Sequence, residues 1–451
     1  MTRLLPLAFL LALPMAAQNE GRATYRTELG HPRLLLPQRR LSLLQKERDR
    51  ESMRWIQFQT LVAGKISFPE PGYAWALYSL AAKSEPHAKQ ATEWAIGSGT
   101  DLRQLALVYD WCFPALGPNA PKLAAKIKAS LEKTASAQDI GTIRARVLAA
   151  LAITDEEPDL ASNVIKQAVE VWWKAHVLGV LAKGDLPFKP SEHLALFELL
   201  HALRDNFDID LRETSAKFFT TLPAYHILAH YPAPFPAPEN EYRIPLMTAH
   251  AEPDVREAAR TRAAALAMVA YDNNAQEMQF VQGWLIQDKF LMRSPYGIPY
   301  EFMWANPYQP GLSFHYLPNI YHDPVTGRLI IRSTWEDDAV WYYQAGGVTQ
   351  MFQNGQIANV QKGAIKEPVT MGNTVLMPPP SNGTFNIATE EQLMHYYLIG
   401  LDPTRRYDLE VDDEEIREVK TDRGGVLELK FPPKRTAAVG MHPSPQTQQA
   451  R

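Results

Sequence analysis

A few histidine, tyrosine and arginine side chains at polar positions are best suited to acid–base chemistry. His193, at the expected start of a helix, is a candidate base, although a lone histidine there can equally be a polar helix-start residue. Tyr242 is a candidate acid, and Arg243 beside it can bind a carboxylate through two parallel hydrogen bonds. His315 and Tyr316 are candidates for the opposite wall of a cleft, or for aromatic packing. Together they predict a proton-transfer site that also holds an anion.

Four further positions are candidates for binding a substrate. Glu241 ends a proline-rich stretch, Tyr231–Arg243, which either presents its polar end at a rim or simply connects two helices. Gln350 and Asn354 lie in a segment rich in amides. Trp75 has the spacing of a helical aromatic, so it either stacks on a sugar or packs in a core.

Metal and cofactor sites find little support in the sequence. His226 and His230 are four residues apart and would share one face of a helix, but no acidic third ligand lies nearby. The carboxylate runs at 337–338 and 412–415 lack the alternating spacing of a calcium loop. The chain has neither a G-x-x-x-x-G-K loop nor a G-x-S-x-G elbow. We therefore predict no cofactor and no metal.

Composition sets the class of protein. A chain of 451 residues is too long for one ordinary core, so two domains are expected. The net charge of -4 is small and not segregated, which argues against nucleic acid as a partner. Cys112 is the only cysteine, lies among apolar residues and predicts a buried thiol. No segment after the N-terminus is apolar for long enough to span a membrane, and nothing predicts an oligomeric state.

The N-terminus has the pattern of an export signal at residues 1–17. Arg3 supplies a positive charge, and Leu4–Leu13 is an apolar run too short to span a bilayer. Small residues near Ala17 predict cleavage there and a periplasmic or secreted protein. The alternative is a buried N-terminal helix.

The chain divides into four parts after this signal. Residues 25–293 show helical periodicity in about eleven segments joined by short breaks, which favours an α/α barrel, toroid or solenoid. Residues 294–323 are rich in aromatics and prolines and are expected to be an irregular interdomain connection. Residues 324–440 contain short strands with turn residues between them, which predicts an antiparallel β-sandwich. The polar tail, 441–451, is predicted to be disordered.

A hairpin opens the predicted β domain. Two strand-like runs, Arg328–Thr334 and Ala339–Ala345, are joined by an acidic turn, and the polar segment Gln350–Gln356 follows. We expect this hairpin to form one wall of any cleft between the two domains.

Four segments resemble the heparinase II/III-like polysaccharide lyase superfamily. They are Gly30–Pro37 with HPRLLLP, Leu105–Leu116 with its YDW…P pattern, the hairpin at Gly327–Gly347, and Thr404–Phe431. The resemblance implies an α+β protein with an incomplete α/α toroid followed by antiparallel β-sheets. It also implies β-elimination on acidic polysaccharides without a cofactor. That chemistry needs a tyrosine or histidine to move the proton and a group that neutralises the uronate carboxylate.

The chain departs from the family pattern at three places. At about the position of the toroid tyrosine it has Ala195 or Leu196, just after His193. The approach to the helix expected at Arg144–Ile153 reads Asp139–Thr142, without the family's neutralising Asn or His, and Thr349–Gly355 lacks the histidine of the β domain. Two hypotheses therefore stay open: a lyase that uses replacement residues, and an inactive relative that binds a glycan or a protein through the same cleft. A purely structural envelope protein is a third, which no specific feature favours.

Overall fold

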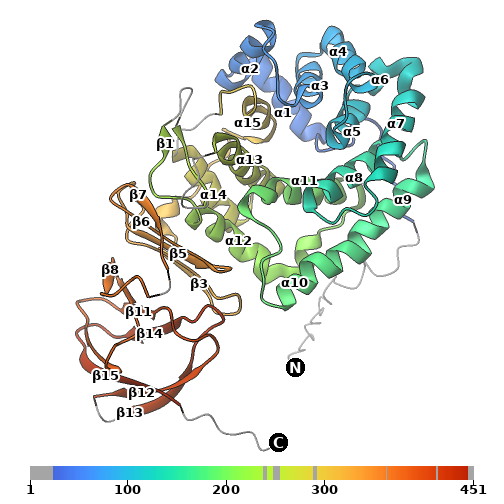
Figure 1. The fold of residues 1–451 in the computed structure, drawn as a ribbon. Coiled ribbons are helices and arrows are strands. Elements are labelled where there is room, and N and C mark those ends of the chain that lie inside the picture. The colour runs from blue at the N-terminus through green and yellow to red at the C-terminus, as the bar shows by residue number, and fades with distance from the viewer. Residues whose placement is uncertain are drawn as a thin grey trace, which may run out of the picture.

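Helices come first along the chain and strands follow (Figure 1). The computed structural model describes residues 24–236, 241–246, 254–287, 292–361, 363–412 and 415–444. The predicted export signal, residues 1–17, lies outside this described part. In the same described ranges, no helix combines the length and the apolar character that crossing a bilayer requires.

The helices are α1 (Gln38–Asp49), α2 (Met53–Ala63), α3 (Pro71–Ala82), α4 (Glu85–Ile96), α5 (Leu102–Trp111), α6 (Phe113–Leu116), α7 (Ala120–Lys133), α8 (Ile140–Ala152), α9 (Pro158–Lys166), α10 (Gly179–Ala182), α11 (His193–Phe207), α12 (Ala216–Leu228), α13 (Val255–Tyr271), α14 (Gln276–Gln287) and α15 (Ile298–Trp304). Several begin at residues that cap them. Asp101 accepts a hydrogen bond from the backbone N–H of Gln104 at 2.8 Å, and Asp139 does the same for Thr142 at 2.8 Å.

The helices form a toroid, as predicted. Helices α3, α5, α8, α11, α13 and α15 pack each against the next, and α15 returns to α3, so they make an inner ring. Helices α4, α7, α9 and α14 lie outside this ring against its members (Figure 1). Every residue of α5 is buried, because the helix is surrounded by α3, α4, α7 and α8.

The strands are β1 (Phe235–Pro236), β2 (Glu241–Tyr242), β3 (Ile320–Asp323), β4 (Arg328–Arg332), β5 (Trp341–Ala345), β6 (Val348–Gln353), β7 (Gln356–Asn359), β8 (Val369–Met371), β9 (Thr374–Met377), β10 (Thr384–Ala388), β11 (Met394–Leu398), β12 (Arg406–Val411), β13 (Glu415–Lys420), β14 (Leu427–Phe431) and β15 (Thr436–Pro443). They form a short β1–β2 pair and three larger sheets, in the orders β3-β4-β5-β6-β7, β14-β11-β9-β8 and β10-β15-β12-β13. The described pairs are antiparallel except β9 with β11, which run parallel.

The three larger sheets stack on one another, so the predicted sandwich has an additional layer. On β4, Ile330 packs into the core of the helices, whereas Leu329 and Ile331 pack against the second sheet with Leu376. This is the period-two alternation of a strand buried on both faces. The third sheet packs on the other face of the second and lies farthest from the helices (Figure 1).

Two predicted boundaries need correction. The connection at 294–323 was expected to be irregular, but it contains α15, which closes the toroid, and β3, which is an edge strand of the first sheet. Helix α15 is ordered by burial, since all seven of its residues are buried. The tail at 441–451 was expected to be disordered, but β15 continues to Pro443 because Met441 packs in the β core. Residues 445–451 lie outside the described part.

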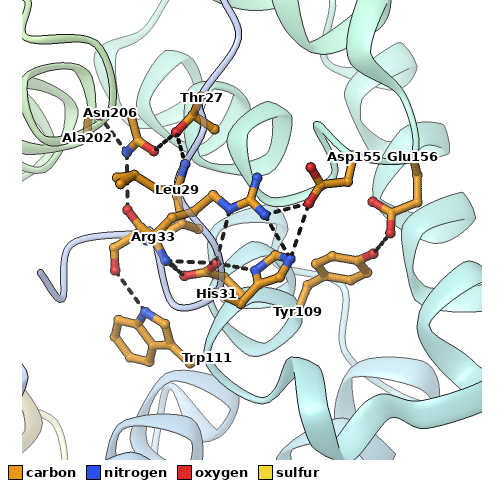
Figure 2. Close-up of polar contacts among 12 residues, drawn as sticks. Thr27, Leu29, His31, Arg33, Tyr109, Trp111, Asp155, Glu156, Ala202 and Asn206 are labelled. Atoms are coloured by element: carbon orange, nitrogen blue, oxygen red, sulfur yellow. Dashed lines mark hydrogen bonds and ion pairs between the residues drawn. The ribbon is translucent and has the colours of Figure 1, made fainter. Parts of the chain in front are cut away.

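Two of the segments that resemble the family, Gly30–Pro37 and Leu105–Leu116, are far apart in the sequence but contact each other in the structure (Figure 2). The fully buried carboxylate of Asp110 accepts hydrogen bonds from the backbone N–H groups of Arg33, at 2.9 Å, and Leu34, at 2.8 Å, and contacts His31 Nδ1 at 2.6 Å. The Arg33 guanidinium pairs with Asp155 at 2.5 Å. These segments therefore attach the start of the chain to α5, and their role is structural.

Candidate functional site

A cleft of about 1070 Å³ lies between the toroid and the first sheet. The segment 186–192 before α11, the segment 244–246, the start of α13 and the side of α12 line it on the helical side, and β5, β6 and β7 line it on the sheet side. The polar side chains among its lining residues are those of Lys189, Glu192, Tyr225, Asp254, Glu257, Tyr343, Thr349, Gln350 and Asn359. Of the predicted hairpin, Tyr343 lines the cleft, and the rest of the sheet wall comes from residues 347–350 and 359–360.

Strand register sets the polar floor of this cleft. Tyr343 on β5 lies opposite Gln350 on β6, and Gln350 lies opposite Asn359 on β7, so the three side chains form one row across the sheet. Tyr231 donates a hydrogen bond to Gln350 Oε1 at 2.9 Å, and Gln350 Nε2 donates to Asn359 Oδ1 at 3.2 Å. The buried amide of Gln350 is therefore fixed by partners on both sides.

A pair of tyrosines joins the two walls. The hydroxyls of Tyr225, on α12, and Tyr343, on β5, lie 3.1 Å apart, within hydrogen-bond distance. Burial raises the pKa of Tyr343 well above its usual value, and the neighbouring Tyr225 hydroxyl adds to this. Tyr343 thus stays protonated, and it can donate its hydrogen bond to the oxygen of Tyr225.

Arg328 places a positive charge beside this pair. Its guanidinium lies 4.7 Å from the centre of the Tyr225 ring and is buried. Asp323 holds it through a contact of 3.0 Å, and Thr326 accepts a hydrogen bond from its Nε at 2.8 Å. The guanidinium is attracted to the face of the Tyr225 ring and so fixes the position of that ring.

Carboxylates outnumber cations among the described residues that line the cleft. Glu192, Asp254 and Glu257 line it, against one ammonium, that of Lys189. Glu192 Oε2 accepts the backbone N–H of Lys189 at 2.7 Å, and Asp254 caps α13 by accepting the N–H of Arg256 at 2.8 Å. The local field therefore disfavours a ligand with dense negative charge.

His193 lies behind the cleft and is not among the residues that line it. It begins α11, is almost fully buried, and its ring centre is 5.8 Å from that of His226. Burial lowers its pKa well below the usual value, and the neighbouring His226 and Arg328 lower it further. The predicted base is therefore a neutral, buried side chain.

The other described residues of the predicted catalytic set lie apart from His193. Arg243 pairs with Asp337 at 3.0 Å and donates to a backbone carbonyl, so it fixes its loop to the turn of the hairpin. His315 contacts Gln287 at 3.1 Å on the surface, and Tyr316 is 84% exposed. None of these three lines the cleft.

Of the described residues predicted to bind substrate, one lines the cleft and the others lie elsewhere. Gln350 lies on the cleft floor. Asn354 is in the tight turn between β6 and β7, with a φ of 52°, and Trp75 packs partly buried against the toroid core. Glu241 and Tyr242 form β2, which pairs with β1, and their side chains lie outside the described part.

The rings of His226 and His230 lie side by side, with their centres 5.1 Å apart. Helix α12 ends at Leu228, so His230 lies beyond the helix that carries His226. His230 Nδ1 is 2.7 Å from the carbonyl oxygen of His226 and is thereby engaged with the backbone. Within the described ranges, no group of three histidine, cysteine, aspartate or glutamate side chains could hold a metal ion.

Tyr225, Tyr343 and Arg328 are not among the site residues predicted from the sequence. The alternation of side chains along the hairpin was an available signal for Arg328 and Tyr343, because alternate residues of a strand face the same side. Both residues lie on the side of β4 and β5 that faces the helices. Nothing in the sequence indicates that Tyr225 is their partner.

The arrangement defines an α+β protein in which a helical toroid and a stack of β-sheets enclose a cleft with a tyrosine pair. No family model and no curated protein matches the sequence. Among solved structures, the chain is similar to a heparan sulfate lyase, HepC, from Pedobacter heparinus, with a TM-score of 0.39 and 12% identity over 82% of this chain and 75% of that chain. A mutant of the same enzyme gives a TM-score of 0.37 with the same identity and coverage. The fold class stated above follows from the chain's own helices and sheets, and no activity follows from a likeness of this size.

Proposed function

We propose that this chain is an exported carbohydrate-active protein that binds a uronate-containing polysaccharide in the cleft and cleaves it by β-elimination, without a cofactor. The observation that carries the proposal is the tyrosine pair, with its hydroxyls 3.1 Å apart on the wall between toroid and sheet. Tyrosine is suited to this reaction because it can accept and then return a proton.

The residues of the cleft supply each step of the reaction. In this step the phenolate form of Tyr225 takes the proton on the carbon next to the uronate carboxylate, while the Tyr343 hydroxyl donates a hydrogen bond to the Tyr225 oxygen. The electrons of that C–H bond form the new C=C bond, and the bond to the leaving oxygen breaks. Tyr225 then returns the proton to the leaving oxygen. Lys189 and the Asn359 amide are the cleft groups available to hold the carboxylate.

The charge of the cleft selects among uronate polymers. Three carboxylates against one ammonium in the described lining favour a chain whose acidic residues alternate with neutral sugars over a heavily sulfated one. The substrate class we propose is therefore an unsulfated uronate polysaccharide.

A catalytically inactive relative that binds a glycan or a protein partner is the second candidate. Two observations favour it: the described lining of the cleft contains no arginine, and Gln350 is already held by Tyr231 and Asn359. Neutralisation of a bound carboxylate would then be incomplete.

Ultraviolet absorbance of unsaturated uronate ends separates the two candidates. The wild-type protein is incubated with unsulfated and sulfated uronate polymers, and Tyr225→Phe is compared with Tyr308→Phe, an exposed tyrosine outside the cleft. We expect turnover on the unsulfated polymer and a loss of about 10²–10⁴-fold in Tyr225→Phe alone. Full activity of Tyr225→Phe would refute the mechanism, and binding without absorbance change in the wild type would establish the binder.

A further inference from the structure

A second cavity, of about 670 Å³, lies on the opposite face of the first sheet. Tyr342 and Gln344 of β5 line it, whereas Tyr343 between them faces the cleft. Its other walls come from the segments that follow β9 and β11, from the turn at Arg423 and Gly424, and from a loop of the toroid that carries Asp185. Its volume is within the range of known ligand sites, roughly 300–1,000 Å³.

The second cavity and the cleft meet at one edge of the first sheet. Gly347, Thr349 and Val360 line both cavities. Gly346 and Gly347 form the turn between β5 and β6, both have a positive φ, and the position of a Cβ atom on either has no neighbouring atom within 4 Å. Little side-chain bulk therefore separates the two cavities at this turn, and an extended ligand can pass from one to the other.

The lining of the second cavity suits a neutral ligand with many hydroxyl groups. Its charged side chains among the described residues are Asp185 and Arg423, whose atoms lie 3.7 Å apart as a pair. The polar remainder is uncharged and partly preorganised: Tyr342 donates to Gln344 Oε1 at 2.7 Å, and Gln344 Nε2 donates to the carbonyl of Gly424 at 2.7 Å. Amides, hydroxyls and backbone groups of glycine turns are the partners that sugar hydroxyls need.

We propose that the second cavity is a subsite for neutral sugar residues of the same glycan chain that occupies the cleft. The assignment to one chain rests on the proposed function of the cleft, whereas the neutral chemistry follows from the second cavity itself. The cleft then holds the acidic residue at the tyrosine pair, and residues further along the chain cross the glycine turn into the second cavity. Affinity should therefore rise with chain length.

Filling the second cavity with a tryptophan side chain tests whether this cavity binds sugar residues. Pro379 lines it from an irregular segment and is exposed, whereas the neighbouring Pro380 does not line it, so Pro379→Trp and Pro380→Trp form a matched pair. Binding of unsulfated uronate–hexosamine di-, tetra- and hexasaccharides is measured by calorimetry. We expect the wild type and Pro380→Trp to gain about tenfold in affinity from di- to hexasaccharide, equivalent to about 1.4 kcal/mol, and Pro379→Trp to lose that gain.

A second probe separates failure of this subsite from failure of the proposed function. An N-acetylhexosamine oligomer, which carries no uronate, should bind the wild type and Tyr225→Phe and lose affinity in Pro379→Trp. If the uronate series does not bind but the neutral oligomer does, the proposed function fails and the subsite stands. An equal gain with length in Pro379→Trp and Pro380→Trp, or no binding of either probe, would overturn the subsite.

Discussion

His322 links the first and second sheets through two carboxylates, and its replacement should destabilise the protein in a pH-dependent way. Its Nε2 lies 3.0 Å from Asp422 and its Nδ1 lies 3.3 Å from Glu428, and the side chain is only 10% exposed. Burial lowers the pKa of His322, but hydrogen bonds and charge from the two carboxylates outweigh burial and raise it to about 9. The imidazolium in turn lowers the pKa of Glu428 below its usual range.

The sign and size of the effect follow from this shift. A histidine whose pKa is higher in the folded state stabilises that state fully below its unfolded pKa, and the contribution is lost as pH rises through the folded pKa. A rise from 6.5 to about 9 corresponds to about 3 kcal/mol, which is an upper value because part of the pair's field is screened by solvent. At low pH, the lowered pKa of Glu428 has a separate effect. The stabilisation that its ionised carboxylate gives the folded state is lost only as pH falls below the usual glutamate range.

The assay is urea unfolding of His322→Gln between pH 5.5 and pH 9.5, values chosen to bracket the titration at about 9. We expect a loss of about 2–3 kcal/mol in the free energy of unfolding at pH 6, shrinking markedly by pH 9.5. His442→Gln, which changes an exposed histidine on β15, is the control and should stay near wild type throughout. A loss for His322→Gln that is equal at both ends of this range would refute the ion-pair reasoning and point to packing.

Two substitutions test buried carboxylates in the toroid. Glu198 is fully buried and pairs with both Arg103, at 2.5 Å, and Arg144, so Glu198→Gln leaves two guanidiniums undercompensated and should cost about 3–5 kcal/mol in urea unfolding. Asp110 accepts two backbone N–H groups of the N-terminal segment, and Asp110→Asn should cost about 1–3 kcal/mol in the same assay. Asp159→Asn changes a carboxylate that is 93% exposed and should be within about 0.5 kcal/mol of wild type. Equal losses in all three variants would contradict the role of burial.

The helical half of the fold could be predicted because its signals are local. Asp101 and Asp139 precede their helices at capping positions, and the apolar periodicity that follows is that of buried helices. The short hairpin β6–β7 was not predicted, because its glutamines and threonine give it the composition of a loop. Its turn, Asn354-Gly355, has φ angles of 52° and 74°, as a tight type I′ turn requires, and this dipeptide was the available signal.

The site was harder to predict than the fold because its residues come together only through packing. Tyr225 and Tyr343 are 118 positions apart, and the position of the sheet on α12 alone makes them neighbours. His193 was selected by its place at a helix start, yet burial of that helix end removes it from the cleft surface. Gln350 was selected for its amide and does line the cleft. Residue type can be read from a sequence, whereas exposure to a cavity depends on the three-dimensional packing.

Strand β5 is the element on which both cavities depend. Successive side chains of a strand point to opposite faces, so Tyr343 reaches Tyr225 in the cleft while Tyr342 and Gln344 line the second cavity. A slip of one residue in its pairing would exchange these faces and disrupt both sites together. Burial on both faces prevents such a slip, since Trp341 packs with the helical core and Tyr342 with the second sheet. The hairpin therefore does more than mark where the β domain begins: its register places Tyr343 of the tyrosine pair at one cavity and the uncharged side chains of Tyr342 and Gln344 at the other.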